Sequence, residues 1–158
     1  MFKKAVREIK KLKIAIEGPS GSGKTLGALR LAKGLVGDDD GNIAFIDTEN
    51  DSGTLYANIV NFHHAQMRPP FNPERFVKAI DYAIEQGFKC LIIDSLSHAW
   101  NGEGGILDMK EKLDARGGNS FTNWGQLTPI QNKLVDKIIN CQIHLICCMR
   151  TKTEYVIE

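Results

Sequence analysis

The sequence predicts a three-layer α/β fold, in which a mainly parallel β-sheet lies between two layers of helices. Short runs of consecutive apolar residues alternate with segments whose apolar residues recur at helical spacing. Strands that are apolar on both faces must be covered on both faces, which helices on either side of a parallel sheet achieve. The 158 residues, 42% of them apolar, are enough for one domain with a substantial core.

The first strand is predicted at the apolar run 12–16, directly before a glycine-rich segment. A helix is expected over residues 26–36, where apolar residues recur at helical spacing, and Gly37 is expected to end it. The next apolar run, residues 43–46, predicts a short buried strand that ends at Asp47.

The segment from residue 50 to residue 70 has no clear pattern, although residues 58–65 are a candidate strand. Asn72 and Pro73 predict the start of a helix, as its N-cap and first residue. Gly87 is expected to end this helix.

Residues 90–93 predict a further buried strand, bounded by Asp94. A loop and a short helix around residues 106–113 should follow, and then a polar stretch over residues 116–123. These elements continue the alternation of buried strands and amphipathic helices that the fold class requires.

Thr128, Pro129 and Gln131 together predict the start of the last helix, as an N-cap, a helix-initiating proline and a capping-box residue. The apolar run 143–148 predicts another buried strand. Residues 155–157 are expected to begin one more strand.

The most specific signal lies between the first strand and the first helix. A glycine is followed by four residues and then Gly-Lys-Thr, which is the phosphate-loop pattern. Its residues are Gly18, Pro19, Ser20, Gly21, Ser22, Gly23, Lys24 and Thr25. Backbone N–H groups of such a loop surround phosphates, the lysine reaches the β- and γ-phosphates, and the threonine hydroxyl ligates Mg²⁺. A glycine- and serine-rich linker is the alternative, but a linker does not require the strand before and the helix after.

Two acidic residues are candidates to complete this site. Asp94 follows a buried strand and is suited to hold Mg²⁺ through a water, opposite Thr25, although an aspartate there could also cap a turn. Many related ATPases have a glutamate directly after this aspartate, whereas this chain has Ser95. Glu49, just past the strand at 43–47, is the better candidate to orient or deprotonate the attacking water, if the two strands are neighbours. A solvated loop carboxylate is the alternative for Glu49.

Four segments resemble the RecA-like branch of phosphate-loop ATPases, and especially phage-type nucleotide-binding proteins associated with single-strand annealing. These segments are residues 18–25, 45–49, 91–100 and 150–155, and the resemblance spans most of the chain after Leu12. It implies a P-loop NTPase fold with a mainly parallel RecA-like sheet, and hydrolysis of ATP with Mg²⁺.

The same resemblance implies roles for individual residues. Glu49 would be the catalytic glutamate, Asp94 the Walker B acid, and the last strand would carry a sensor of the γ-phosphate. RecA has a glutamine near that point, whereas this chain has Cys148-Met149 followed by Arg150. Arg150 or Lys152 could take the sensor role or act across a subunit boundary, and either could instead be a surface cation.

Residues 1–11 are interpreted as a basic leader before a core at residues 12–158. This core is shorter than RecA-like proteins usually are, which leaves truncation at its carboxyl end as one interpretation. The net charge is +1, but Glu8 is the only acidic residue among the first thirteen, which are rich in Lys and Arg. Such a segment could contact nucleic acid or an acidic partner, or be simply solvated.

No apolar run approaches the roughly 18 residues of a membrane span, and no secretory pattern is present, so we expect a cytoplasmic protein.

Single-stranded DNA and further copies of the chain, in a ring or filament, are the partners that the resemblance implies. DNA contacts would fall in residues 98–124, where Trp100, Phe121 and Trp124 could stack on bases. Packing is the alternative for these aromatic residues, and the acidic residues around them disfavour contact with phosphates.

The four cysteines and four histidines lack the spacing of a zinc site or a redox pair, so reduced and buried cysteines are expected.

A small kinase and a scaffold that holds nucleotide without hydrolysing it are alternatives to the ATPase. A GTPase is disfavoured, because its guanine-reading pattern appears only as a near miss at residues 132–135, inside a predicted helix.

Overall fold

The computed structural model describes residues 2–8, 10–37, 40–117 and 119–151, and within them it has one sheet of five parallel strands in the order β1-β5-β4-β2-β3. The strands are β1 (Lys13–Gly18), β2 (Ile43–Asp47), β3 (His63–Gln66), β4 (Cys90–Asp94) and β5 (His144–Arg150). The helices are α1 (Lys24–Val36), α2 (Pro73–Glu85), α3 (Ser97–Asn101), α4 (Ile106–Ala115) and α5 (Ser120–Ile139), and 3-10 turns lie at η1 (Asp40–Asn42) and η2 (Ser52–Tyr56).

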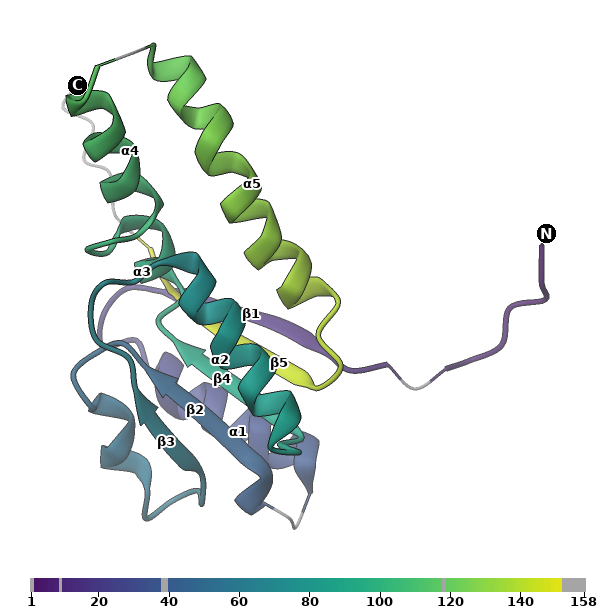
Figure 1. Cartoon of the computed structure of the whole chain (residues 1–158). Helices are drawn as coiled ribbons and strands as arrows, with labels where there is room; N and C mark the ends of the chain where they lie inside the picture. The colour runs from purple at the N-terminus through teal and green to yellow at the C-terminus, as the bar shows by residue number, and fades with distance from the viewer. Residues whose placement is uncertain (1, 9, 38–39, 118, 152–158) are drawn as a thin grey trace, which may run out of the picture.

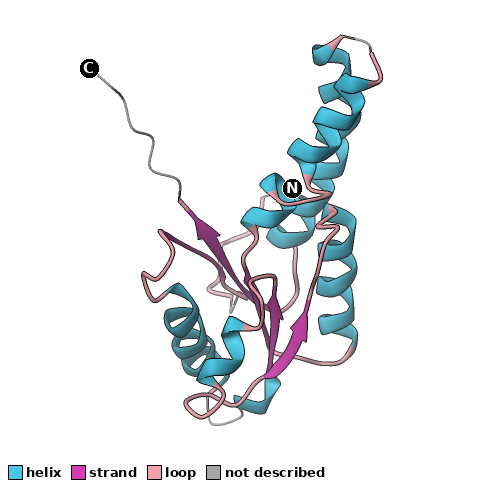
Figure 2. Ribbon diagram, turned by 90° about the vertical axis from the view of Figure 1, so that its left-hand side faces the viewer, coloured by secondary structure: helices cyan, strands magenta, loops and turns pink. Residues whose placement is uncertain are grey.

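Helices cover both faces of the sheet, as Figures 1 and 2 show, so the predicted three-layer fold is confirmed. On one face α1 packs onto the sheet, with Leu29 and Ile92 fully buried in the same cluster. On the other face α2 and α5 pack together, and Phe76 shares its cluster with Leu91 and Ile93. Successive side chains of β4 therefore face opposite helix layers, and because both faces are buried the strand is apolar from residue 90 to residue 93.

The carboxyl ends of the strands meet at one edge of the sheet, as expected. In the register of the sheet, Gly18 pairs with Arg150 on the adjacent β5. Asp94 pairs with Asp47 on one side and with Cys148 on the other. The glycine-rich loop and the polar residues that follow β2, β4 and β5 are thereby brought to the same edge, where ligands bind in open α/β sheets.

The predicted start of the last helix is wrong. Helix α5 begins at Ser120, where the Asn119 side chain accepts a hydrogen bond from the Phe121 N–H at 2.9 Å, and Pro129 lies inside the helix. A proline there removes the N–H that would bond the carbonyl of Gly125, and its ring crowds that carbonyl. Buried Asn123 and Leu127 anchor the amino-terminal half of the helix, so its packing outweighs the lost bond. In Figure 1 this half runs beside α4, beyond the sheet.

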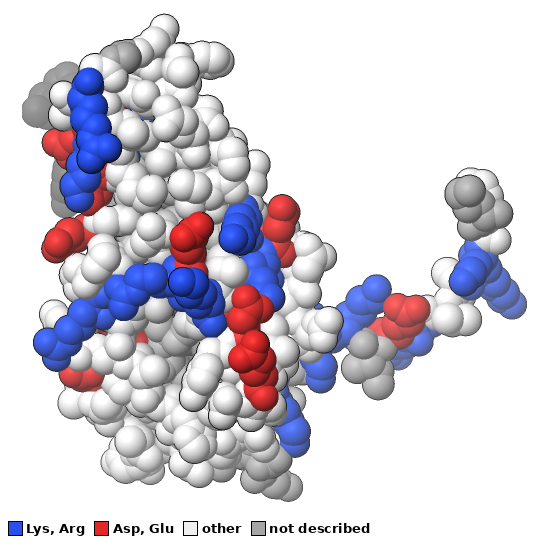
Figure 3. All heavy atoms as spheres, in the orientation of Figure 1, with Lys and Arg blue, Asp and Glu red and all other residues white. Residues whose placement is uncertain are grey.

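Three other elements differ from the prediction or lie beyond its test. The candidate strand at 58–65 is β3, four residues long and shifted toward its carboxyl end. Helix α3 was not predicted, and the expected strand at 155–157 and Lys152 lie outside the described residues. The described part of residues 2–11 is exposed, has no regular secondary structure and extends away from the body with many Lys and Arg side chains (Figures 1 and 3).

Candidate nucleotide-binding site

The loop between β1 and α1 owes its shape to two glycines with left-handed backbone. Gly21 has φ 77° and Gly23 has φ 82°, a conformation that other residues rarely adopt. A Cβ at either position would meet nothing within 4 Å, so the backbone angle, and not crowding, requires glycine there. Gly23 is also the N-cap of α1 and offers no side-chain cap, which leaves the first N–H groups of the helix directed at this loop.

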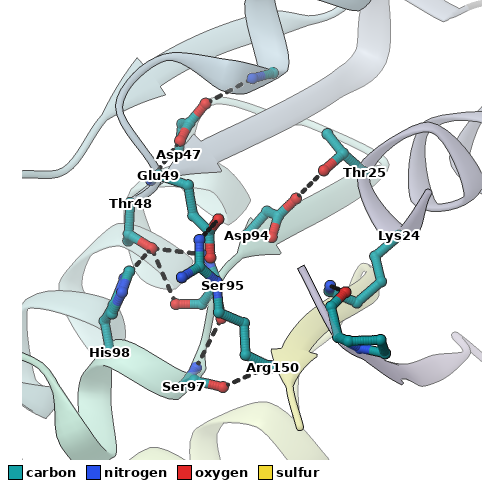
Figure 4. Close-up of polar contacts among 12 residues, drawn as sticks. Lys24, Thr25, Asp47, Thr48, Glu49, Asp94, Ser95, Ser97, His98 and Arg150 are labelled. Atoms are coloured by element: carbon teal, nitrogen blue, oxygen red, sulfur yellow. Dashed lines mark hydrogen bonds and ion pairs between the residues drawn. The ribbon is translucent and has the colours of Figure 1, made fainter. Parts of the chain in front are cut away.

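Lys24 folds over its own loop. Its Nζ donates a hydrogen bond to the carbonyl oxygen of Pro19 at 2.7 Å, as Figure 4 shows. This ammonium group is thus held over the glycine-rich backbone by a single neutral acceptor. An anion in the loop could compete for it, because a charged acceptor binds an ammonium group more strongly than a carbonyl does.

Thr25 and Asp94 meet across the site. The Thr25 hydroxyl donates a hydrogen bond to Asp94 Oδ2 at 2.6 Å, and Asp94 is almost fully buried. Burial is the main cause that raises the pKa of the Asp94 carboxyl, with the Thr25 hydrogen bond opposing it and the charge of Glu49 adding to it. A buried carboxylate beside a hydroxyl offers the hard oxygen ligands that Mg²⁺ prefers, and a cation there would stabilise the ionised form.

These two residues do not form a complete metal cage. No group of three or more His, Cys, Asp or Glu residues suited to a metal ion exists in the part of the chain that the structure describes. Mg²⁺ is usually held by one or two protein oxygens together with waters and the phosphates of a substrate. Thr25 and Asp94 therefore fit Mg²⁺ that arrives with a nucleotide.

Glu49 and Arg150 form an ion pair through Glu49 Oε2 and Arg150 Nη2. The other carboxylate oxygen, Glu49 Oε1, is buried and has no hydrogen-bond partner. The hydrogen bond to Glu49 raises the pKa of the Arg150 guanidinium above its ordinary value, so the arginine stays charged. A buried acceptor without a partner is costly, so Oε1 is suited to receive a donor that comes with a ligand or water.

Asp47 shapes the segment that carries Glu49. Its buried carboxylate accepts hydrogen bonds from the Glu49 N–H at 2.6 Å and the Gly53 N–H at 2.8 Å. His64 Nε2 lies 3.4 Å from the same carboxylate. Asp47 thus stabilises the turn after β2 and places Glu49 at the edge of the sheet.

A hydrogen-bond network that was not predicted from the sequence connects the strand ends below this ion pair. The Thr48 hydroxyl oxygen accepts a hydrogen bond from the Ser95 N–H at 2.7 Å and lies 2.7 Å from His98 Nδ1. The Ser97 hydroxyl oxygen accepts a hydrogen bond from the Arg150 N–H at 2.9 Å (Figure 4). The only indication of this network in the sequence is the polar residues that follow the apolar runs 43–46 and 90–93. Which residues they contact depends on the order of the strands in the sheet.

The structure brings together two of the three aromatic residues considered for base stacking. The rings of Trp100 and Trp124 stack with centroids 5.9 Å apart, and Lys110 Nζ lies 5.4 Å from the Trp124 ring centroid. Phe121 is exposed and does not join them. The stacking indicates that the two tryptophans pack against each other, which is the alternative to base stacking. Trp100 nevertheless exposes part of its surface.

A parallel sheet with a glycine-rich loop between its first strand and first helix is the fold of P-loop NTPases. A family model described as an AAA domain matches residues 10–158, so the chain belongs to the AAA domain family, whose members are generally nucleotide-binding P-loop ATPases. A comparison with curated proteins finds no match. Within the described residues, no helix has the length and apolar character needed to cross a membrane.

Proposed function

We propose that this chain binds Mg-ATP at residues 18–25 and hydrolyses it, with Glu49 as the general base. The observation that carries the proposal is the carboxylate of Glu49, which has one oxygen paired with Arg150 and one buried oxygen without a partner. Because β2 and β4 are neighbours, this carboxylate lies at the same edge of the sheet as Asp94. The candidate role of Glu49 required the strands before Glu49 and Asp94 to be neighbours, and their pairing supports the proposal.

The loop residues bind and orient the triphosphate. The N–H groups of the loop and of the first turn of α1 contact phosphate oxygens, and Lys24 exchanges the Pro19 carbonyl for a phosphate oxygen. Thr25 and Asp94 would hold Mg²⁺ that arrives with the nucleotide. When bound, this ion offsets the negative charge of the phosphates.

Glu49 and Arg150 act on the γ-phosphate side. Glu49 Oε1 accepts a proton from the attacking water, and Arg150 stabilises negative charge on the transferred group. Arg150 is held near the first glycine of the loop, since the Thr151 N–H donates to the Gly18 carbonyl at 3.3 Å and Arg150 pairs with Gly18. The arginine is thus placed beside the loop that binds the phosphates.

We further propose that the chain is RecA-like and acts in phage-type DNA recombination or single-strand annealing, as a ring or filament in the cytoplasm. The four segments that resemble this group support the proposal, and they include the loop, Glu49, Asp94 and Arg150. The basic segment at residues 2–8 and 10–13 is a candidate contact with single-stranded DNA. Residues 1–11 are then a leader to the ATPase core at 12–158.

The test is phosphate release with and without single-stranded DNA, on the wild type and on Glu49→Gln. We expect the variant to bind Mg-ATP like the wild type but to hydrolyse it about 100- to 10,000-fold more slowly, because glutamine accepts the Arg150 hydrogen bond but no proton. The matched control, Glu85→Gln on the exposed end of α2, should leave turnover unchanged. Undiminished turnover in Glu49→Gln would contradict the proposal.

Two other outcomes identify the alternatives. Phosphate transfer to a small acceptor, without release to water, would indicate a kinase. Tight binding without turnover, even with single-stranded DNA present, would indicate a scaffold in which Glu49 has no catalytic task.

A further inference from the structure

Thr48 links the backbone segments that carry the two carboxylates of the site, Glu49 and Asp94. It directly precedes Glu49, and its N–H donates to the Asp94 carbonyl at 2.7 Å, which extends the pairing of β2 with β4. Its hydroxyl oxygen accepts the Ser95 N–H at 2.7 Å, and Ser95 directly follows Asp94. Both Thr48 and Ser95 are buried. These contacts set the separation between the backbone of Glu49 and the backbone of Asp94.

His98 holds this threonine from α3. Its Nδ1 lies 2.7 Å from Thr48 Oγ1, and Phe71 stacks on the imidazole with ring centroids 4.7 Å apart. The Phe71 N–H donates to the Glu103 carbonyl at 2.6 Å, and a Cβ at Gly102 would come within 2.7 Å of both Phe71 and the His98 carbonyl. The imidazole is therefore held in one plane by close packing on its outer side.

The hydrogen atoms available at the Thr48 hydroxyl limit how this contact can work. The hydroxyl has one hydrogen, the Ser95 N–H already occupies one of its lone pairs, and the Ser95 carbonyl lies 3.1 Å away. If Thr48 donates to the Ser95 carbonyl, His98 Nδ1 must carry a hydrogen; if Nδ1 is bare, Thr48 donates to it. Burial lowers the pKa of His98, so a neutral imidazole makes this contact at neutral pH.

The residue before His98 holds the other half of the ion pair. Ser97 Oγ accepts the Arg150 N–H at 2.9 Å, and the Leu96 N–H donates to the Cys148 carbonyl at 2.9 Å. The start of α3 thus makes two sets of contacts. Leu96 and Ser97 contact the end of β5, which carries Arg150, and His98 contacts Thr48, the residue before Glu49. In Figure 4, Thr48 and His98 lie to one side of the Glu49–Arg150 pair, and Ser97 lies below it.

We propose that His98 is a positioning residue, which acts through Thr48 to keep Glu49 at a fixed place relative to Asp94 and Arg150. The proposal rests on the proposed hydrolytic function. His98 contacts Thr48 and Phe71 and does not reach the carboxylate of Glu49 by any hydrogen bond that the described residues show. The charges of Glu49 and Arg150 also act on the pKa of His98, in opposite directions, but its hydrogen-bond contact is with Thr48, so we assign its effect on turnover to the backbone that carries the general base.

The first test separates turnover from binding in variants of His98. His98→Phe keeps an aromatic ring against Phe71 but has no nitrogen, whereas His98→Asn places an amide near the position of Nδ1. We expect His98→Phe to lower kcat about 10- to 100-fold with unchanged affinity for Mg-ATP, because small displacements of a catalytic group cost rate and not binding. His98→Asn should restore most of the rate. Equal rates in wild type and His98→Phe, or a loss that asparagine does not rescue, would overturn the proposal.

The second test asks whether His98 acts through Thr48. Thr48→Val removes the hydroxyl at nearly constant volume, and because this hydroxyl also accepts the Ser95 N–H, the variant should lose at least as much rate as His98→Phe. The double variant should be no slower than Thr48→Val alone, because that variant has already removed the contact with His98. Losses that multiply would show that His98 and Thr48 act separately and would overturn the proposal.

A third test does not require activity. In the ¹⁵N spectrum of the imidazole, Thr48→Val should move the His98 Nδ1 resonance, while Thr54→Val, on a hydroxyl that bonds the Asp51 carbonyl instead, should not. An unmoved His98 resonance in Thr48→Val would overturn the contact itself. If the wild type hydrolyses no ATP, the proposed function fails and the catalytic purpose of the contact fails with it, whereas the resonance still decides whether the contact exists.

Discussion

Arg150, the last residue of β5, forms an ion pair with Glu49, two residues past the end of β2, although β4 lies between these strands. The two side chains therefore meet over the end of β4, where Asp94 is placed. The charges of both interact with Asp94, because Glu49 contributes to raising the pKa of the Asp94 carboxyl and the charge of Asp94 contributes to raising the pKa of Arg150. One ion pair thus links the ends of β2 and β5 across the end of β4, which carries the candidate metal ligand.

Replacing Arg150 tests whether the ion pair serves catalysis. We expect Arg150→Ala to lower kcat about 100-fold, because a positive group aimed at developing negative charge is lost, with a smaller effect on nucleotide affinity. Arg150→Lys should retain part of the rate, since it keeps the charge but not the planar donor group. Steady-state phosphate release is the measurement, with Arg30→Ala on the exposed side of α1 as the control. Faster turnover in Arg150→Ala would show that the arginine restrains Glu49 instead.

The buried carboxyl of Asp94 predicts a conflict between stability and metal binding. Its pKa is raised, chiefly by burial, so its protonated form stabilises the fold and that contribution is lost as the pH rises through the folded-state pKa. Asp94→Asn is neutral at every pH and can still accept the Thr25 hydrogen bond. Without Mg²⁺, the variant should therefore unfold at a higher temperature than the wild type at pH 8, with a smaller difference at pH 5.

Adding Mg-ATP should reverse this order. The wild type should gain thermal stability, because a ligand that binds only the folded state stabilises it, and Asp94→Asn should gain little. Thermal unfolding followed by circular dichroism, at both pH values and with and without Mg-ATP, gives all of these comparisons. A variant that is less stable than the wild type in the absence of Mg²⁺ at pH 8 would contradict the account.

The cysteines should be unreactive in the folded protein. All four are buried and free, and burial raises the pKa of Cys90 and of Cys147 to about 12 and raises that of Cys148 as well. Because the thiolate is the reactive form, a thiol reagent at pH 8 should modify the native protein only as fast as it unfolds. All four thiols should react at once in denaturant. Rapid modification of the native protein would contradict the buried positions.

The sequence predicted best what short segments determine. The loop at 18–25, the strand before it and α1 after it follow from one local pattern, and Asp94 follows from a single apolar run. The start of α5 was wrong because Pro129 is common at helix starts, whereas buried residues far from it in the chain decide where this helix begins. Local preference is a weaker guide than packing in such a case.

The arrangement around Glu49 could not be derived from the sequence, because it depends on the order of strands in the sheet. Alternating strands and helices do not specify that β5 lies between β1 and β4, or that β4 lies beside β2. The contacts of Thr48 with Ser95 and of Arg150 with Glu49 join residues 47 and 101 positions apart. Only the strand order makes them neighbours.

The most direct measurement of the central claim is the equilibrium affinity for Mg-ATP, by calorimetric titration of the wild type and of Lys24→Ala. Lys24 Nζ is held over the loop by the Pro19 carbonyl alone among its described contacts, so its removal should leave the fold intact. We expect Lys24→Ala to bind Mg-ATP about 10- to 100-fold more weakly, as the loss of a charge-assisted hydrogen bond implies, while Lys78→Ala on the exposed side of α2 binds like the wild type. Equal affinity in Lys24→Ala and the wild type would contradict a phosphate-binding role for this loop.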